Sequence, residues 1–125
     1  MHFVTGQVKI VNSYPVYVKS GDTVALICQS AKRANISWEQ SPPGTNTFSE
    51  VLAGQQDISI QRCHTDPSGF SKSTLYRSSM TLSTRGSYRC MDKSSSYTIA
   101  VTVLYSMLIV LCVSLHYCKR LDYMY

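Results

Sequence analysis

The stretch Gly86-Ser87-Tyr88-Arg89-Cys90 decides the fold of this 125-residue chain when it is read with two residues far upstream. Cys28 lies 62 residues before Cys90, and Trp38 follows Cys28 by ten residues. Before the first cysteine, Val24, Leu26 and Cys28 share one parity, which is typical of a strand that buries one face. The cysteines, the tryptophan and the tyrosine therefore all fall on predicted strands.

This combination of residues resembles the immunoglobulin superfamily over roughly residues 8–103. The resemblance implies an all-β fold, a two-sheet antiparallel sandwich of variable or intermediate type. It also implies a disulfide between Cys28 and Cys90 that joins the two sheets. The indole of Trp38 would pack on the sulfurs in the core, and Tyr88 would tie down the adjoining corner.

Two positions depart from the pattern of that superfamily. Arg77 stands where an apolar residue is usual, and Thr84 replaces an aspartate that makes an ion pair in many members. Arg77 belongs to a long strand that the sequence predicts from Ser73 to Leu82, and Thr84 follows it. At the other end of the domain, residues 8–18 read as a first strand interrupted by Pro15, which an edge strand tolerates because it can spare one ladder donor.

Composition narrows the function class. The chain has five cysteines but no Cys-x-x-Cys pair, and its histidines (His2, His64, His116) are far apart, so no metal site is expected. An oxidising compartment explains the cysteines better. The net charge of +5 is scattered, with no run of more than two basic residues, which disfavours nucleic-acid binding. No catalytic motif is present, so we expect neither an enzyme nor a cofactor.

The carboxy-terminal stretch from Ile99 to Cys118 carries no formal charge and is followed at once by Lys119-Arg120. An apolar run of about 20 residues can span a bilayer, and basic residues beyond it favour a cytoplasmic end. If the last strand ends near residue 103, a transmembrane helix is expected over 104–118 and a short cytoplasmic tail over 119–125. The alternative is a last strand followed by a short buried segment.

Residues 1–7 are interpreted as an amino-terminal extension. They lack the apolar core of a secretory signal, so we expect no signal peptide within this chain. We therefore interpret the sequence as a fragment or a mature form of a single-pass plasma-membrane protein with its domain outside the cell. Retention of the domain in the cytosol is the alternative.

Several polar residues are candidates for surface chemistry. Asn35-Ile36-Ser37 is an N-glycosylation acceptor, and Asn35 has outward parity opposite to that of the tryptophan. Lys32, Arg33, Arg89 and Lys93 could form one basic binding face for an acidic protein surface or a sialylated glycan. Ordinary solvated charges are the alternative interpretation of these four residues.

Two further cysteines are candidates for modification. The spacing from Cys63 to Cys90, together with Asp122-Tyr123-Met124, is similar to T-cell costimulatory receptors, in which such a cysteine forms a second bridge. The partner cysteine is absent here, so Cys63 is predicted to form an intermolecular disulfide or to stay a free thiol. Cys118, next to Lys119, is a candidate palmitoylation site or an ordinary apolar residue.

These features predict a receptor or accessory protein that binds another protein at the cell surface through an exposed sheet face. An assembly subunit that forms a homodimer through Cys63 is the first alternative. A soluble decoy domain, or a soluble intracellular sandwich, is the other. A sandwich of this kind hosts many unrelated functions, so the fold alone does not choose among them.

Overall fold

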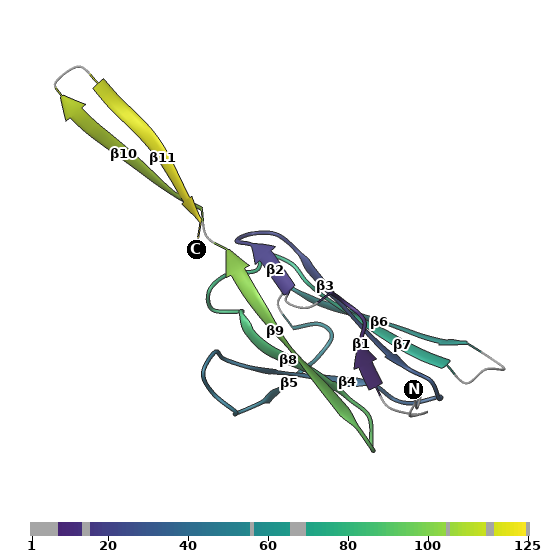
Figure 1. Ribbon diagram of the computed structural model, residues 1–125. Helices are drawn as coiled ribbons and strands as arrows, with labels where there is room; N and C mark the ends of the chain where they lie inside the picture. Colours follow the sequence, from purple (N-terminus) through teal and green to yellow (C-terminus); the bar gives the residue numbers. More distant parts are fainter. Residues whose placement is uncertain are drawn as a thin grey trace, which may run out of the picture.

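The computed structural model describes residues 8–13, 16–55, 57–65, 70–104, 106–114 and 117–124. Its main body is a sandwich of two sheets, and the described residues contain no helix (Figure 1). One sheet has the strand order β1 (Val8–Ile10), β3 (Val24–Ser30), β7 (Phe70–Arg77) and β6 (Ile58–Thr65). The other has the order β2 (Val16–Lys19), β9 (Ser96–Leu104), β8 (Gly86–Met91), β4 (Ser37–Ser41) and β5 (Ser49–Val51). The predicted all-β, two-sheet sandwich is confirmed.

The core lies where the two sheets face each other, and a disulfide crosses it. Cys28 on β3 is bonded to Cys90 on β8, with a Cα–Cα distance of 6.4 Å. Trp38 on β4 lies opposite Cys90 in the ladder and is 1% exposed. Its indole Nε1 donates a hydrogen bond of 2.9 Å to the hydroxyl of Ser73 on β7. The tryptophan therefore links the sheets beside the disulfide through a polar contact as well as through packing.

The first predicted strand is two strands in different sheets. β1 pairs antiparallel with β3, whereas β2 pairs parallel with β9, so the sandwich is not wholly antiparallel. The chain changes sheet after Asn12, whose side chain accepts a hydrogen bond from the N–H of Ile27 and donates one to the carbonyl of Ala25. Because β2 keeps the direction of the chain as it crosses, it runs alongside β9. Both β1 and β2 are edge strands, as the proline suggested, although Pro15 itself lies outside the described residues.

The strand predicted from Ser73 to Leu82 was misplaced, since β7 runs from Phe70 to Arg77. The ladder ends there because Ser79 takes a positive φ of 55°, which turns the chain out of the sheet. Met80 is still fully buried, as expected from the resemblance to the immunoglobulin superfamily, in which this position is apolar and faces inward. A loop holds it there: its N–H donates to the carbonyl of Asp22, and its own carbonyl accepts from Gly21.

The carboxy-terminal stretch also differs from the prediction. A helix was expected over 104–118, but the described residues of that range (104, 106–114 and 117–118) belong to the end of β9, to β10 (Ser106–Ser114) and to the start of β11 (Tyr117–Met124). β10 and β11 pair antiparallel, and Figure 1 draws this hairpin beyond the end of β9. Antiparallel pairing provides hydrogen-bond partners for the backbone N–H and C=O groups of this run, which is rich in β-branched residues. Within the described ranges, no helix has the length and apolar character needed to cross a membrane.

Candidate functional site

The centre of the outer face of the five-stranded sheet is an arginine–glutamate pair. Glu39 on β4 and Arg89 on β8 lie opposite each other in the ladder. Both point outward because their neighbours Trp38 and Cys90 point into the core. The Nε of Arg89 donates to Oε1 of Glu39 at 3.0 Å, and its Nη2 donates to the same oxygen. With side chains 27% and 22% exposed, the two groups form a partly desolvated ion pair.

An aromatic ring completes this centre. The guanidinium carbon of Arg89 lies 3.8 Å from the centroid of the Phe48 ring, a cation–π geometry. Phe48 directly precedes β5, next to the strand that carries Glu39. The three residues, which we call the outer-face cluster, hold the guanidinium between a carboxylate and a ring. Its orientation is therefore set before any partner arrives.

Small side chains surround the cluster. On β9, Thr98, Ala100 and Thr102 are exposed on the same face. At the end of the sheet where β8 begins, Ala100 and Thr102 line a hollow of about 310 Å³ together with Pro43, Gly44, Arg85 and Ser87. Such side chains let another protein surface approach the sheet closely.

Gly86 makes the start of β8 possible next to this hollow. It has φ +137°, and a Cβ added there would lie 2.2 Å from the carbonyl oxygen of Ser41. Only glycine is compatible with both the backbone conformation and the close approach of β4. The glycine of the sequence stretch that predicted the fold therefore has a packing role of its own.

The loop between β8 and β9 is tightly hydrogen-bonded. Oδ1 of Asp92 accepts hydrogen bonds from the backbone N–H and the hydroxyl of both Ser94 and Ser95. Burial raises the pKa of Asp92, but these hydrogen bonds outweigh it and leave the pKa below its ordinary value. Ser95 also accepts a hydrogen bond from the N–H of Val8 on β1. The loop is thus tied to the opposite sheet.

The four residues predicted as one basic face are divided between two places. Arg89 lies on the sheet and is paired with Glu39. Lys32, Arg33 and Lys93 lie in loops and are exposed. A hydrogen bond of 3.2 Å from Lys32 Nζ to Ser94 Oγ brings the β3–β4 loop to the β8–β9 loop, which carries Lys93. The loop end is therefore basic, whereas the sheet face is close to charge-balanced.

Sequence reasoning missed Glu39 and Phe48. The parity signal for Glu39 was present, since it follows Trp38 as Arg89 precedes Cys90. Placing the two side chains opposite each other requires the β4–β8 register, in which Trp38 faces Cys90. No local pattern marks Phe48, because it reaches the guanidinium from outside a strand.

The structure places the other candidate residues as follows. Asn35 is exposed just before β4, and Cys63 is an exposed free thiol on the edge strand β6. Cys118 lies in β11, and its side chain is outside the described part of the structure. Among the residues that the structure describes, no group of His, Cys, Asp and Glu could hold a metal ion.

A second polar cluster lies between the sheets. The guanidinium of Arg77 on β7 donates from Nη1 to Oε1 of Gln40 at 2.8 Å and contacts the hydroxyl of Tyr88 at 3.4 Å. The Tyr88 hydroxyl donates to the carbonyl of Thr84, which also accepts from Nε2 of Gln40. Burial raises the pKa of Tyr88, and the charge and hydrogen bond of Arg77 offset this only in part. Both unusual sequence positions, Arg77 and Thr84, therefore meet at the same tyrosine.

Solved structures resemble this chain, although no protein-family model and no curated protein matches it. A chain in the crystal structure of Dpr2 Ig1-Ig2 in complex with DIP-Theta Ig1-Ig3 gives a TM-score of 0.60 at 22% identity, covering 79% of this chain and 49% of that one. A structure from work on multimeric cell-adhesive interactions of VGSC beta subunits gives 0.56 at 15%, covering 70% and 88%. Titin domain I10 gives 0.51 at 13%, covering 78% and 98%.

These likenesses, with the disulfide and the two sheets, show an immunoglobulin-like domain. The chain spans about half the length of the first of the three structures. Two of them come from studies of protein complexes or cell adhesion, and the third is a titin domain. The fold is shared by all three at low identity, so the function must be argued from the surface of this chain.

Proposed function

We propose that this chain is a cell-surface recognition module that binds another protein through the outer face of the sheet β2-β9-β8-β4-β5. The observation that carries the proposal is the outer-face cluster, in which Glu39 and Phe48 fix the guanidinium of Arg89 at the middle of that face. Arginine and aromatic residues predominate among the residues that carry binding energy at interfaces. A side chain that is already oriented loses less conformational entropy on binding.

The surroundings of the cluster support this use of the face. Thr98, Ala100 and Thr102 offer small polar and apolar groups on the neighbouring strand β9. A rim of small residues around an anchoring arginine can exclude water from the contact. The structural neighbours that are described in complexes or in adhesive interactions are consistent with a protein partner.

The sheet face and the loop end favour different partners. Because Glu39 balances Arg89, the sheet face suits a protein surface of mixed charge. An acidic or sialylated ligand is proposed only for the loop end, where Lys32, Arg33 and Lys93 are exposed. The two cases differ in salt dependence, since binding to the loop end would weaken more steeply as ionic strength rises.

Extracellular display belongs to the same proposal. The Cys28–Cys90 bridge and the exposed acceptor Asn35 both suit a protein of the secretory route, and glycosylation at Asn35 would leave the core undisturbed. Membrane attachment through residues 104–118, beyond the part of β9 that is buried in the sandwich, is tested by alkaline carbonate extraction of cells that express the full chain. Retention in the pellet supports attachment, and release into the supernatant contradicts it.

The binding face is tested with a multivalent form of the full chain, screened against a panel of cell-surface ectodomains. For any partner found, Ala100→Arg places a long charged side chain on the proposed face, and we expect affinity to fall at least tenfold. Gln61→Arg is the matched control, because Gln61 is exposed on β6 of the other sheet. If Gln61→Arg lost binding and Ala100→Arg kept it, this face would be rejected as the binding surface.

A homodimer linked through Cys63 is the second candidate. It is favoured by the exposure of the thiol and by its position on β6, an edge strand of its sheet. Gel mobility of the oxidised full chain tests it, with Cys63→Ser as the control. A band of doubled mass that disappears on reduction and in the variant supports the dimer, and a monomer band in every lane rejects it.

A further inference from the structure

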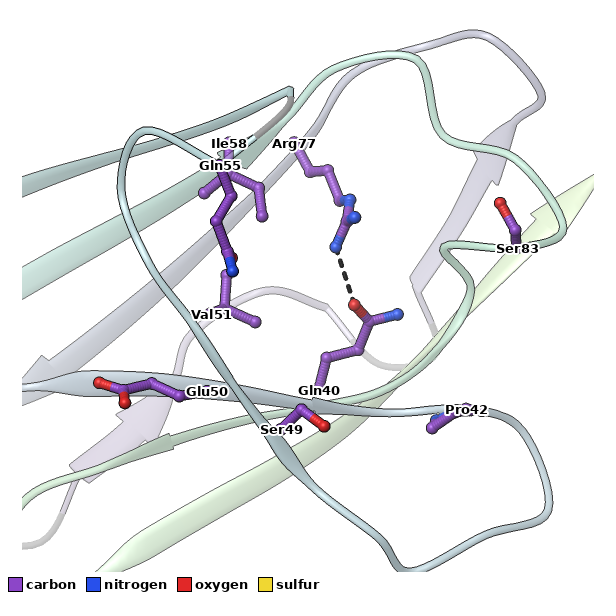
Figure 2. A pocket seen from close by; sticks show the side chains of 9 residues that line it. All are labelled: Gln40, Pro42, Ser49, Glu50, Val51, Gln55, Ile58, Arg77 and Ser83. Carbon is purple, nitrogen blue, oxygen red and sulfur yellow. Dashed lines mark hydrogen bonds between the residues drawn. The ribbon is translucent and has the colours of Figure 1, made fainter.

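A cavity of about 430 Å³ opens between the two sheets, away from the outer face. Its lining comes from both sheets and from the turn that links β5 to β6, as Figure 2 shows, and includes Gln40, Val51, Gln55, Ile58 and Arg77. This volume lies within the range of about 300–1,000 Å³ that is usual for small-molecule sites. The proposed protein partner would not cover it.

Hydrogen-bond donors predominate among the polar groups that meet in this cavity. Arg77 is half-buried, and its Nε is fully buried with no hydrogen-bond partner. Figure 2 shows its side chain reaching across to Gln40, which it contacts only through Nη1. The Nε has no surface open to the cavity, so Nη2 is the nitrogen of this guanidinium that can donate to an oxygen of a ligand there.

Gln55 supplies a further donor at the mouth of the cavity. Its Oε1 accepts the N–H of Leu52 at 2.9 Å, which fixes the side-chain amide. Because that bond uses the oxygen, the Nε2 amino group is directed to other partners. In Figure 2 the amide of Gln55 extends into the space between Val51 and Arg77.

The charge of the cavity is uncompensated. In the described ranges, Arg77 contacts neutral oxygens of Gln40 and Tyr88 and no carboxylate. Glu50 lines the cavity, but it is exposed, and its carboxylate points away from Arg77 in Figure 2. An anion in the cavity would give this guanidinium, which has no carboxylate partner in the described ranges, a charge-assisted hydrogen bond.

We propose that this cavity binds a small oxyanion, a carboxylate or a phosphate, through Nη2 of Arg77 and the amide of Gln55. The apolar side chains of Val51 and Ile58 line the cavity beside the anion and would contact the rest of a larger ligand. This site is independent of the outer-face cluster, so each can be tested without the other.

Thermal unfolding of the full chain tests the proposal, with sodium phosphate or sodium acetate added and ionic strength held constant with chloride. Binding to the folded state alone raises Tm in a saturable manner. We expect a rise of about 4 °C or more at saturation with at least one of the two anions. Phosphate alone assigns the site to phosphoryl groups, and acetate alone assigns it to carboxylates.

Two cavity variants and one control variant separate specific binding from a general salt effect. Gln55→Glu keeps the acceptor for Leu52 but replaces the amino donor with a carboxylate oxygen that repels the anion. Gln61→Glu makes the same change of charge at an exposed position on β6, outside the cavity. Arg77→Gln removes the cation itself and serves as the second cavity variant.

The proposal predicts a saturable rise of Tm in the unmodified chain and in Gln61→Glu, with less than a quarter of that rise in Gln55→Glu and Arg77→Gln. Should Arg77→Gln fail to fold, the pair of glutamate variants still decides the result. An equal response in all variants would assign the effect to salt exclusion from the protein surface and overturn the proposal. The absence of any response in the unmodified chain would overturn it as well.

Discussion

Arg77 and Arg89 show how differently one residue type behaves on the two sides of a sheet. Arg89 points outward from β8, and Glu39 and Phe48 together hold its guanidinium. Arg77 points between the sheets from β7, contacts only neutral oxygens there and keeps a buried Nε without a partner. The guanidinium of Arg89 already has two partners that hold it in place, so it can serve as an anchor for a binding partner. The inner one has unused hydrogen-bonding capacity, which is the property of a binding site.

Strand parity explains the difference. On β7, Arg77 has the same parity as the buried Leu75, so its side chain enters the sandwich at the end of the strand. On β8, Arg89 has the opposite parity to Tyr88 and Cys90 and emerges on the surface. In this chain, the charged residue whose parity directs it between the sheets is the one that lines a cavity.

The largest effect is expected from removing the frame on which both arginines depend. Cys28→Ala combined with Cys90→Ala releases a loop of 62 residues, which we expect to cost about 4 kcal/mol in the free energy of unfolding. Urea denaturation measures it, and Cys63→Ser is the control with an unchanged midpoint. An unchanged midpoint in the double variant would mean that packing around Trp38 alone holds the sheets together.

A direct contrast of the two arginines comes next. Arg77→Met leaves the inward-facing Oε1 of Gln40 without its donor, at a cost of about 1–3 kcal/mol in stability. Arg89→Met removes a partly exposed ion pair and one cation–π contact, together worth about 1 kcal/mol. Chemical denaturation of both variants checks the order. A larger loss in Arg89→Met would show that the outer-face cluster is structural and not a preformed binding group.

Alkaline pH should act on the inner cluster alone. The pKa of Tyr88 in the folded chain is raised above its ordinary value of 10.0, chiefly by burial, so the unfolded chain loses that proton first. The stability that depends on this proton is complete below pH 10 and is lost as pH rises through the folded pKa. Denaturation midpoints between pH 8 and 11 measure the loss. Tyr88→Phe should show a shallower decline, and an identical decline would contradict this assignment.

The smallest effect is expected at acid pH, in the loop beside the outer face. The folded pKa of Asp92 lies below its ordinary value of 3.8, because its hydrogen bonds outweigh the opposing effect of burial. Its contribution is complete above pH 3.8 and falls as pH drops through the folded pKa. Asp92→Asn keeps an oxygen acceptor but cannot titrate. Its stability should therefore change less between pH 5 and 2.5, and parallel curves for the two proteins would refute the interpretation.

Much of the fold could be predicted from the sequence, because burial parity is a local property. Val24, Leu26 and Cys28 alternate inward as predicted, and Trp38 on β4 is buried as the resemblance implied. The structure differs from the prediction where contacts between residues far apart in the sequence determine the strand pairing. β2 joins β9 in parallel only because the chain changes sheets, and β7 stops at Arg77 because a loop takes Met80 into the core. A helix was expected over residues 104–118, whereas the described residues there form strands, a pairing that hydropathy alone does not indicate.

The functional surfaces were less predictable than the fold. Arg89 was recognised as outward-facing, but its partner Glu39 depends on the register between β4 and β8. Arg77 was visible only as a departure from a family pattern. Its cavity is built from strands far apart in the chain, and no window of sequence contains them together.

The parallel pairing of β2 with β9 has a mechanical consequence. Residues 16–19 of β2 are bonded in register to residues 101–104 of β9, just before the chain leaves the sandwich. A pull on the chain beyond Leu104, opposed at the amino-terminal end of β2, acts along these two strands. All rungs of the ladder then bear the load in shear at the same time and do not open one after another. A molecule that links two surfaces would resist tension best in this direction.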